Sequence, residues 1–327
     1  MSAPLRLGTR RSALATAQSQ QIADLLATVS GREVVLVPIT SEGDVSRASL
    51  SQLGGRGVFA TRLREALLAD ECDLLVHSLK DLPTAEAPGL VIAATPRRED
   101  ARDVVITRDG TPIAEMAAGS VIGTGSPRRI AQLRRRNPGL VAHDLRGNVD
   151  SRLSRVRDGE LDAVILAAAG LSRLGGAAND LFSEPLELAQ WPTAPGQGSL
   201  AVEARQDAPA DLLAAIGRLD DTATRVAVTL ERAVLAGLDA GCSAPVGVHA
   251  VLEGDHLRVR AAVYAADGSR AIEAERNLCV RDGYAGPTGS GDGARAAGDD
   301  DPIAGARETG SDVARELLER GAAEVSP

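Results

Sequence analysis

Two kinds of side chain are nearly absent from this sequence of 327 residues. Aromatic residues make up only 2%, so the core must be packed with alanine, valine, leucine and isoleucine. Lysine occurs once, at Lys80, and every other basic residue is arginine. The heavy use of alanine, glycine and arginine indicates a bias in nucleotide composition. That bias lowers the weight of any single arginine and raises the interest of Lys80.

The sequence also lacks the marks of several protein classes. A net charge of -9 and a pI near 5.1 exclude a global basic surface for nucleic acid. The longest apolar runs are too short to span a membrane, and the first twelve residues have no apolar region of the signal-peptide kind. The three cysteines and four histidines lack the spacing of a disulfide framework or a metal site. We therefore expect a cytoplasmic protein that binds no metal, nucleic acid or membrane.

The apolar pattern predicts α/β units over the first two-thirds of the chain. Short strands alternate there with amphipathic helices, which is typical of mostly parallel sheets covered on both faces. Strands are expected at 4–9, 33–39, 73–78, 90–96, 103–107, 120–125, 140–145 and 162–169, and at the end of 191–205. Helices are expected at 12–29, 58–69, 128–136 and 149–159. A chain of this length is too long for one typical domain.

Two polar segments, 96–103 and 191–205, are interpreted as crossings between two lobes. They predict domain 1 at 1–97 and 197–216 and domain 2 at 98–196, with a hinge and a cleft between them. Domain 3, at 217–327, is predicted as a small α+β unit. Its elements are a helix at 220–238, strands at 244–253, 256–265 and 272–280, and a helix at 313–324. Residues 282–303, rich in Gly and Asp, are predicted as a disordered insertion.

The strand 73–78 leads directly into Lys80 and Asp81. In open α/β sheets, ligands bind outside the carboxyl ends of the strands, so this pair is a candidate for a site. Lysine is a compact charge on a flexible stem, and a site that needs this form would resist the arginine bias. The alternative is a solvated loop with no function.

Three further strand ends carry hydroxyl or basic groups. Residues 123–129, GTGSPRR, predict a helix start capped by Ser126, with Arg128 and Arg129 in its first turn; such N-termini bind anions, although an ordinary capped helix has the same pattern. Arg146 and Arg152 follow another strand, and Arg10 and Ser12 a third. In an acidic protein this convergence predicts a small polyanionic ligand, because guanidinium groups bind carboxylates bidentately.

Other polar residues carry weaker signals. Residues 134–136, RRR, are predicted to be a solvated helix face. Cys242 follows the helix at 220–238 in an exposed-looking loop and is either reactive or inert. Cys72 and Cys279 border strands and are predicted to be structural. We find no Walker motif, no G-x-G-x-x-G after a strand and no Ser-His-Asp pattern.

Nine stretches together resemble the hydroxymethylbilane synthase family, also called porphobilinogen deaminase, along nearly the whole chain. They occur in family order and with family spacing. The stretches are RLGTRRSALATAQ, SEGD, LGGRGVFATRLREALL, DLLVHSLKDLPT, GTGSPRR, LRGNVDSRL, DAVILAAAGLSRLG, APGQGSLAVE and GCSAPVG.

The resemblance implies a transferase of tetrapyrrole (haem) biosynthesis. Four porphobilinogen molecules are joined head to tail with loss of ammonia, on a covalent dipyrromethane that matches Cys242. Asp81 matches the catalytic aspartate, which gives acid help to the departing amine and stabilises the cationic azafulvene. The implied cofactor-binding residues are Cys242, Lys80, Asp81, Ser12, Ser126, Arg128, Arg129 and Arg146. The implied substrate-binding residues are Arg10, Arg146, Arg152 and Phe59. The resemblance also implies a monomer that hands its product to uroporphyrinogen-III synthase.

Departures from the family pattern concern the ligand contacts. Gly125 stands where the family often has a serine hydroxyl. In the loop from about residue 41 to 57, which resembles the family's lid, Gln52 and Arg56 stand where lysines are frequent. Two alternatives remain: an anion-binding module like the two-lobed periplasmic proteins, and an inactive homologue. The first would need an export signal or a DNA-binding helix pair, and neither is visible.

Overall fold

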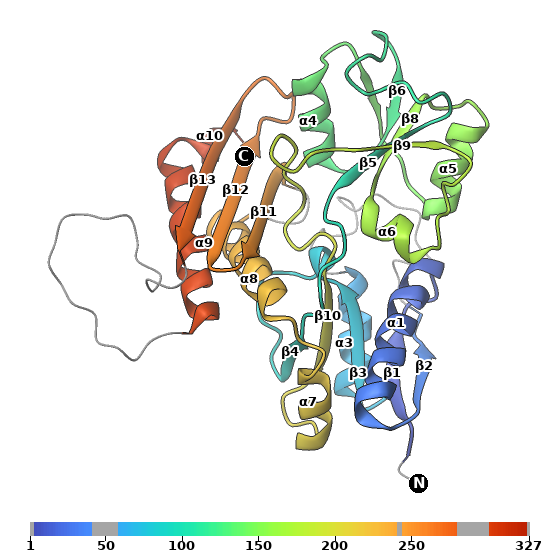
Figure 1. Cartoon of the computed structure of the whole chain (residues 1–327), viewed down its shortest axis with the longest axis vertical. Coiled ribbons are helices and arrows are strands. Elements are labelled where there is room, and N and C mark those ends of the chain that lie inside the picture. Colours follow the sequence, from blue (N-terminus) through green and yellow to red (C-terminus); the bar gives the residue numbers. More distant parts are fainter. Residues whose placement is uncertain (1–2, 41–57, 241–243, 280–300, 326–327) are drawn as a thin grey trace, which may run out of the picture.

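The computed structural model describes residues 3–40, 58–240, 244–279 and 301–325 (Figure 1). Within these ranges the chain forms two α/β lobes and a small α+β domain, as the sequence predicts. Lobe 1 contains a sheet of order β2-β1-β3-β10-β4, and lobe 2 a sheet of order β7-β6-β8-β5-β9. The third domain contains the sheet β11-β12-β13. Both lobes have the same architecture, a five-stranded mixed sheet with helices on its faces.

The bounds of the elements are as follows. The strands are β1 (Leu5–Thr9), β2 (Val34–Pro38), β3 (Leu74–Ser78), β4 (Leu90–Ala94), β5 (Asp103–Thr107), β6 (Val121–Gly123), β7 (Val141–His143), β8 (Ala163–Ala167), β9 (Phe182–Pro185), β10 (Leu200–Arg205), β11 (Val246–Glu253), β12 (His256–Tyr264) and β13 (Ala271–Cys279). The helices are α1 (Ala13–Ser30), α3 (Val58–Leu68), α4 (Pro127–Arg136), α5 (Val149–Arg157), α6 (Ala168–Arg173), α7 (Ala210–Gly217), α8 (Thr222–Gly237), α9 (Pro302–Glu319) and α10 (Ala322–Val325), with a 3₁₀ turn, η1 (Leu79–Asp81).

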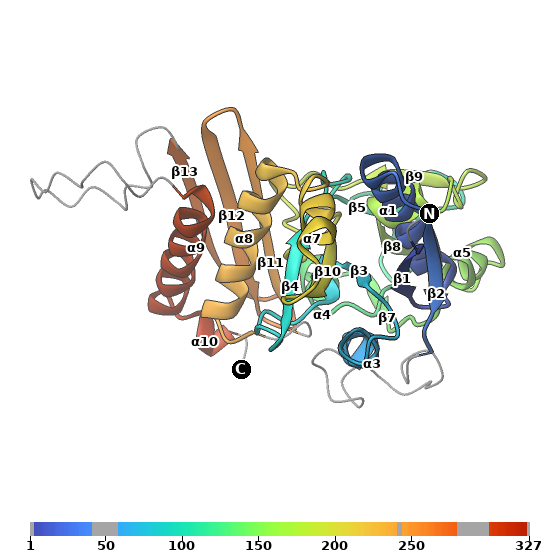
Figure 2. The same cartoon turned by 90° about the horizontal axis from the view of Figure 1, so that it is seen from below.

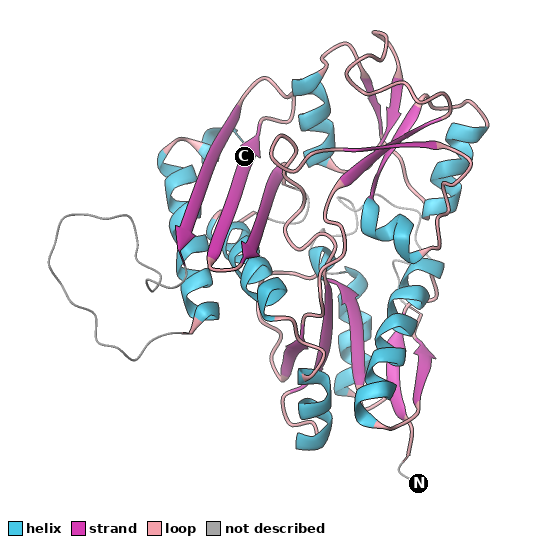
Figure 3. Ribbon diagram, in the orientation of Figure 1, coloured by secondary structure: helices cyan, strands magenta, loops and turns pink. Residues whose placement is uncertain are grey.

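Helices cover both faces of each lobe's sheet (Figure 3). Side chains alternate between the two faces of a strand, so adjacent residues join different cores. In β3, Leu74 packs with α1 and α7, whereas Leu75 packs with α3 on the other face. In β5, Val105 packs with α4 and Val104 with α5. In the third domain, α8 and α9 lie side by side against one face of the three-stranded sheet (Figure 2).

The prediction of mostly parallel sheets is only half right. In lobe 1, β1 pairs in parallel with β2 and β3, but β10 runs antiparallel to both β3 and β4. Lobe 2 repeats this arrangement, with β5 antiparallel to β8 and β9. The reversed strand is in each case the one that enters its lobe after crossing from the other. This strand enters the sheet at the end where its neighbours finish, so it runs antiparallel to them.

The start of the last long helix differs from the prediction as well. We expected residues 282–303 to be a disordered insertion and the helix to begin at 313. Residues 282–300 lie outside the described part of the chain, but α9 begins at Pro302. Asp301 caps this helix by accepting a hydrogen bond from Ile303 N at 2.9 Å, and proline suits the first helical position.

The described helices include none that is long and apolar enough to cross a membrane.

Both crossings between the lobes meet the third domain at one buried carboxylate, Glu231 of α8. Glu231 is fully buried and accepts hydrogen bonds from Arg98 Nη1 at 2.7 Å and from the backbone N–H of Gly196 at 2.6 Å. Arg98 belongs to the first crossing and Gly196 to the second. Arg98 also donates to the carbonyl of Gln197 at 2.8 Å. The backbone N–H of Ala250 in β11 also donates to Glu231, at 2.7 Å. This carboxylate therefore joins both crossings to α8 and β11 of the third domain.

Replacing Glu231 by Gln tests that role. Gln preserves the shape but leaves Arg98 buried without a counter-charge, so we expect a loss of about 3 kcal/mol in the free energy of unfolding. Urea denaturation measures the change. Glu253→Gln is the control, because its ion pair with Arg258 is exposed on both sides and is worth well under ~1 kcal/mol. A Glu231→Gln protein as stable as the control would contradict the role.

Candidate functional site

The loop that carries Lys80 and Asp81 is held rigidly at the carboxyl end of β3. Its backbone forms η1, and Leu79 N donates to the carbonyl of Ser199 at 3.0 Å. Leu79 is buried against Gly196, whose φ of +76° favours glycine. Lys80 is half-buried and Asp81 is exposed. The exposed carboxylate is thus fixed at a strand end, where ligands bind in such folds.

Lys80 is linked to lobe 2 through the return crossing. Its Nζ donates to Gln197 Oε1 at 3.3 Å, and Gln197 Nε2 donates to Asp103 Oδ1 at 2.8 Å. Burial lowers the pKa of Lys80 to about 8. The nearby Asp81 and Asp103 oppose this lowering, whereas Arg129 and Arg128 add to it. Charged groups of both lobes therefore influence the ammonium group of Lys80.

Asp103, at the start of β5, is the centre of this arrangement. It is fully buried and pairs with Arg129 Nη2 at 2.6 Å and with Arg128 Nη1 at 2.9 Å. Trp191 Nε1 donates at 2.8 Å to Asp103 Oδ2, the oxygen that Arg128 also contacts. These charges hold the pKa of Asp103 well below its usual range, although burial acts in the opposite direction and is the largest single influence. A carboxylate so strongly paired stays ionised at every physiological pH.

Arg128 and Arg129 lie in the first turn of α4, which Ser126 caps by accepting from Arg129 N at 3.5 Å. The alternative of an ordinary capped helix with exposed arginines is wrong, because both side chains are nearly fully buried and neutralised in part by Asp103. Their Nε atoms are buried and have no hydrogen-bond partner among the described residues. Each arginine thus keeps donor capacity for a further acceptor.

Two more arginines join this cluster from the next strand end. Burial lowers the pKa of Arg152, and the charges of Arg129 and Arg146 lower it further. Arg152 is therefore repelled by a cation of α4 and by one at its own strand end. Arg146 is exposed, and Arg152 donates to the carbonyl of Gly147 at 2.9 Å. An anionic ligand would relieve the repulsion.

The third strand end contributes Arg10 and Ser12. Arg10 is half-buried directly after β1. Ser12 caps α1, and its oxygen accepts from Ala15 N at 3.3 Å. The helix cap and ligand binding are compatible, because a hydroxyl both accepts and donates.

Some predicted site residues lie outside the described part of the chain. These are Cys242 and the lid segment 41–57, with Gln52 and Arg56. Phe59 belongs to α3, and its side chain is likewise not described.

The sequence does not single out two residues of the site, Asp103 and Gln197. Asp103 belongs to a predicted strand, and Gln197 to one of the stretches that match the family. One available signal was Asp103 itself, since a carboxylate opening an otherwise apolar strand needs a buried partner.

A dipyrromethane is a chain of two pyrroles bearing acetate and propionate groups. The described residues fit such a group in chemistry. Buried arginine Nε atoms without partners, a half-buried ammonium and a cluster of mutually repelling guanidinium groups all call for carboxylates. The fold and this chemistry together define a two-lobed protein that binds a small polycarboxylate.

Comparison with known proteins identifies the family. Residues 5–211 match the family model "Porphobilinogen deaminase, dipyromethane cofactor binding domain", and residues 225–319 match "Porphobilinogen deaminase, C-terminal domain". The porphobilinogen deaminase of Leifsonia xyli is 51% identical over 99% of this chain and 94% of its own length. That of Thermobifida fusca is 46% identical over 98% and 95%, respectively. An arginine-binding periplasmic protein of Salmonella typhimurium aligns with a TM-score of 0.38 and 14% identity, over 67% of this chain and 92% of that one.

The chain belongs to the porphobilinogen deaminase family. Its function is therefore the deaminating condensation of porphobilinogen in tetrapyrrole biosynthesis, with a dipyrromethane cofactor. This confirms the transferase and the cofactor that the sequence predicted, and it removes the periplasmic binding module as an alternative.

The titration of Lys80 can be measured directly. Because it is the only lysine, labelling with [ε-¹³C]lysine gives one side-chain signal. In protein freed of the cofactor we expect a midpoint of about pH 8, with the amine charged below that pH and neutral above it. Asp81→Asn should lower the midpoint further, because Asp81 favours the charged form. A midpoint near the usual value for lysine, about 10.4, would show that burial does not act on this amine.

Proposed function

We propose that Asp81 is the catalytic acid and charge-stabilising group of this deaminase. The observation that carries the proposal is that the exposed carboxylate of Asp81 follows Lys80 at the end of β3, and that Lys80 is influenced both by Asp81 and by Arg128 and Arg129 of lobe 2. The cations bind the substrate's carboxylates. Asp81, in the turn η1 after β3, is the acidic group beside them. From this position it supplies a proton to the departing amine and then balances the positive charge left on the pyrrole.

The proposed ligand contacts divide between the two bound species. Lys80, Ser12, Ser126, Arg128, Arg129 and Arg146, together with Asp81, hold the cofactor. Arg10, Arg146, Arg152 and Phe59 bind the incoming porphobilinogen. The dipyrromethane, when bound, supplies a covalent primer on Cys242. A primer fixed in this way makes each condensation effectively intramolecular, which lowers its entropic cost.

Support for the anchoring role of Cys242 comes from the other two cysteines. Cys72 is fully buried in the core beside β3, and burial raises the pKa of its thiol to about 11. A thiol with so high a pKa is a poor nucleophile at neutral pH. Cys279 ends β13, in a sheet remote from the strand ends of the two lobes.

We further propose the domain limits and cellular setting of the enzyme. The limits are 1–97 with 197–216, 98–196, and 217–327. They are supported by the three sheets, whose strands each fall within one of these units. We propose that the enzyme works as a cytoplasmic monomer that passes its product to uroporphyrinogen-III synthase. Free Cys72 and Cys279 thiols are consistent with a reducing compartment.

Asp81→Asn tests the catalytic proposal. We expect turnover of porphobilinogen to fall by roughly 10²–10⁴-fold, the usual worth of acid–base catalysis, while the cofactor remains attached. Initial rates and an intact mass measure the two quantities. Glu86→Gln, five residues further on and exposed, is the control and should keep wild-type turnover. Near-normal turnover of the Asp81→Asn enzyme would remove Asp81 from the mechanism.

Cys242→Ala tests the anchor. The purified protein should have the mass of the bare chain and give no Ehrlich colour, whereas Cys279→Ser should keep the added mass of two linked pyrroles. A peptide map around residue 242 of the wild-type protein locates the attachment. A cofactor still covalently bound to the Cys242→Ala chain would place the anchor elsewhere.

A further inference from the structure

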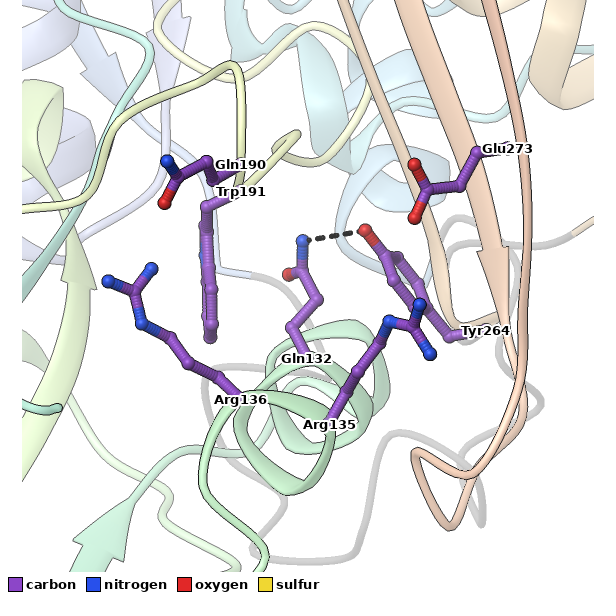
Figure 4. Close-up of a pocket in the computed structure, with 7 residues that line it drawn as sticks. All are labelled: Gln132, Arg135, Arg136, Gln190, Trp191, Tyr264 and Glu273. Atoms are coloured by element: carbon purple, nitrogen blue, oxygen red, sulfur yellow. Dashed lines mark hydrogen bonds between the residues drawn. The ribbon is translucent and has the colours of Figure 1, made fainter.

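A hollow lies between α4 of lobe 2 and the sheet of the third domain (Figure 4). Its volume is about 400 Å³, which is within the range of small-molecule pockets, roughly 300–1,000 Å³. The lining residues are Gln132, Arg135, Arg136, Gln190, Trp191, Tyr264 and Glu273. None of these residues has a role in the proposed reaction.

The floor of the hollow is aromatic and rigid. Trp191 and Tyr264 are nearly fully buried and are held by hydrogen bonds at their polar atoms. Tyr264 Oη accepts from Gln132 Nε2 at 3.1 Å, and the same nitrogen donates to the carbonyl of Pro192 at 2.9 Å. Both rings are almost completely covered by protein, so they form a fixed wall and not a free stacking surface.

The rim of the hollow is cationic. Arg135 and Arg136 are exposed and lie on either side of Gln132 in the last turn of α4 (Figure 4). The partial negative charge of the helix C-terminus offsets only part of theirs. Glu273, the acidic residue of the lining, is already paired with Arg260 at 2.9 Å. The remaining charge therefore favours an anion, and guanidinium groups favour a carboxylate.

The floor is also the back wall of the cofactor-binding cluster. Gln132 Oε1 accepts from Arg128 Nη1 at 2.7 Å, and Trp191 Nε1 donates to Asp103 at 2.8 Å. Arg128 and Asp103 are themselves paired, so the four side chains form a continuous chain in the order Gln132, Arg128, Asp103 and Trp191. A displacement of either floor residue would change the position or the charge balance of Arg128.

We propose that this hollow binds a small organic anion with at least one carboxylate, and that its occupancy alters catalysis through Arg128 and Asp103. The binding part of the proposal is independent of the reaction, whereas the effect on catalysis rests on the proposed role of Arg128. The hollow then serves as an effector site between lobe 2 and the third domain.

Trp191 makes the proposal directly testable, because it is the only tryptophan in the chain. Isophthalate, a planar dicarboxylate, is the probe. Titration into the holoenzyme should give a saturable change in tryptophan fluorescence and, over the same concentrations, a change in the initial rate with porphobilinogen. In Arg135→Gln/Arg136→Gln the apparent Kd should rise roughly tenfold or more, with the basal rate unchanged. Arg134→Gln is the matched control, since Arg134 contacts the carbonyl of Ala266 outside the hollow.

The variants separate this site from the catalytic cleft. Arg146→Gln should leave the fluorescence titration unchanged, because Arg146 belongs to the other cluster. The proposal is overturned if wild-type fluorescence shows no saturable change, or if the double variant binds as tightly as wild type. It is also overturned if the probe binds with no effect on the rate. Loss of turnover in Asp81→Asn has no bearing on these outcomes, so the two proposals fail separately.

Discussion

The buried carboxylate of Asp103 is the interaction on which the rest of the site depends. Two arginines in the first turn of α4 are buried within lobe 2, and burial of guanidinium groups without a counter-charge costs several kcal/mol. Asp103 supplies that charge and also orders Trp191 and Gln197. Through Gln197 the same carboxylate reaches Lys80 of lobe 1. One side chain thus fixes cations that arise from distant parts of the sequence.

This arrangement explains why the chain has a lysine at position 80 despite its preference for arginine. Lys80 is flanked by charges of both signs, and burial lowers its pKa to about 8. A guanidinium remains charged at any such pH and brings a broad planar fork into the space beside Gln197. The ammonium is compact and can lose its proton, so the loop accommodates it at lower electrostatic cost.

Local patterns predicted the elements of the fold, and contacts distant in sequence account for what was missed. The alternation of strands and helices identified both lobes, and the strand ends drew attention to Lys80, Arg146 and Arg152. The partners of Arg128 and Arg129 were not predictable, because Asp103 precedes them by about 25 residues on a strand with an unknown direction. The antiparallel insertion of β10 was missed for the same reason: strand direction depends on the route of the chain.

The position of β10 also constrains the order of folding. This strand lies between β3 and β4, yet it follows all of lobe 2 in the sequence. As the chain leaves the ribosome, lobe 2 has all five of its strands before the sheet of lobe 1 receives its inner strand. Until then β3 and β4 expose unpaired edges, which are the part of a nascent chain most prone to aggregation. The first lobe to be synthesised is therefore the second to be completed.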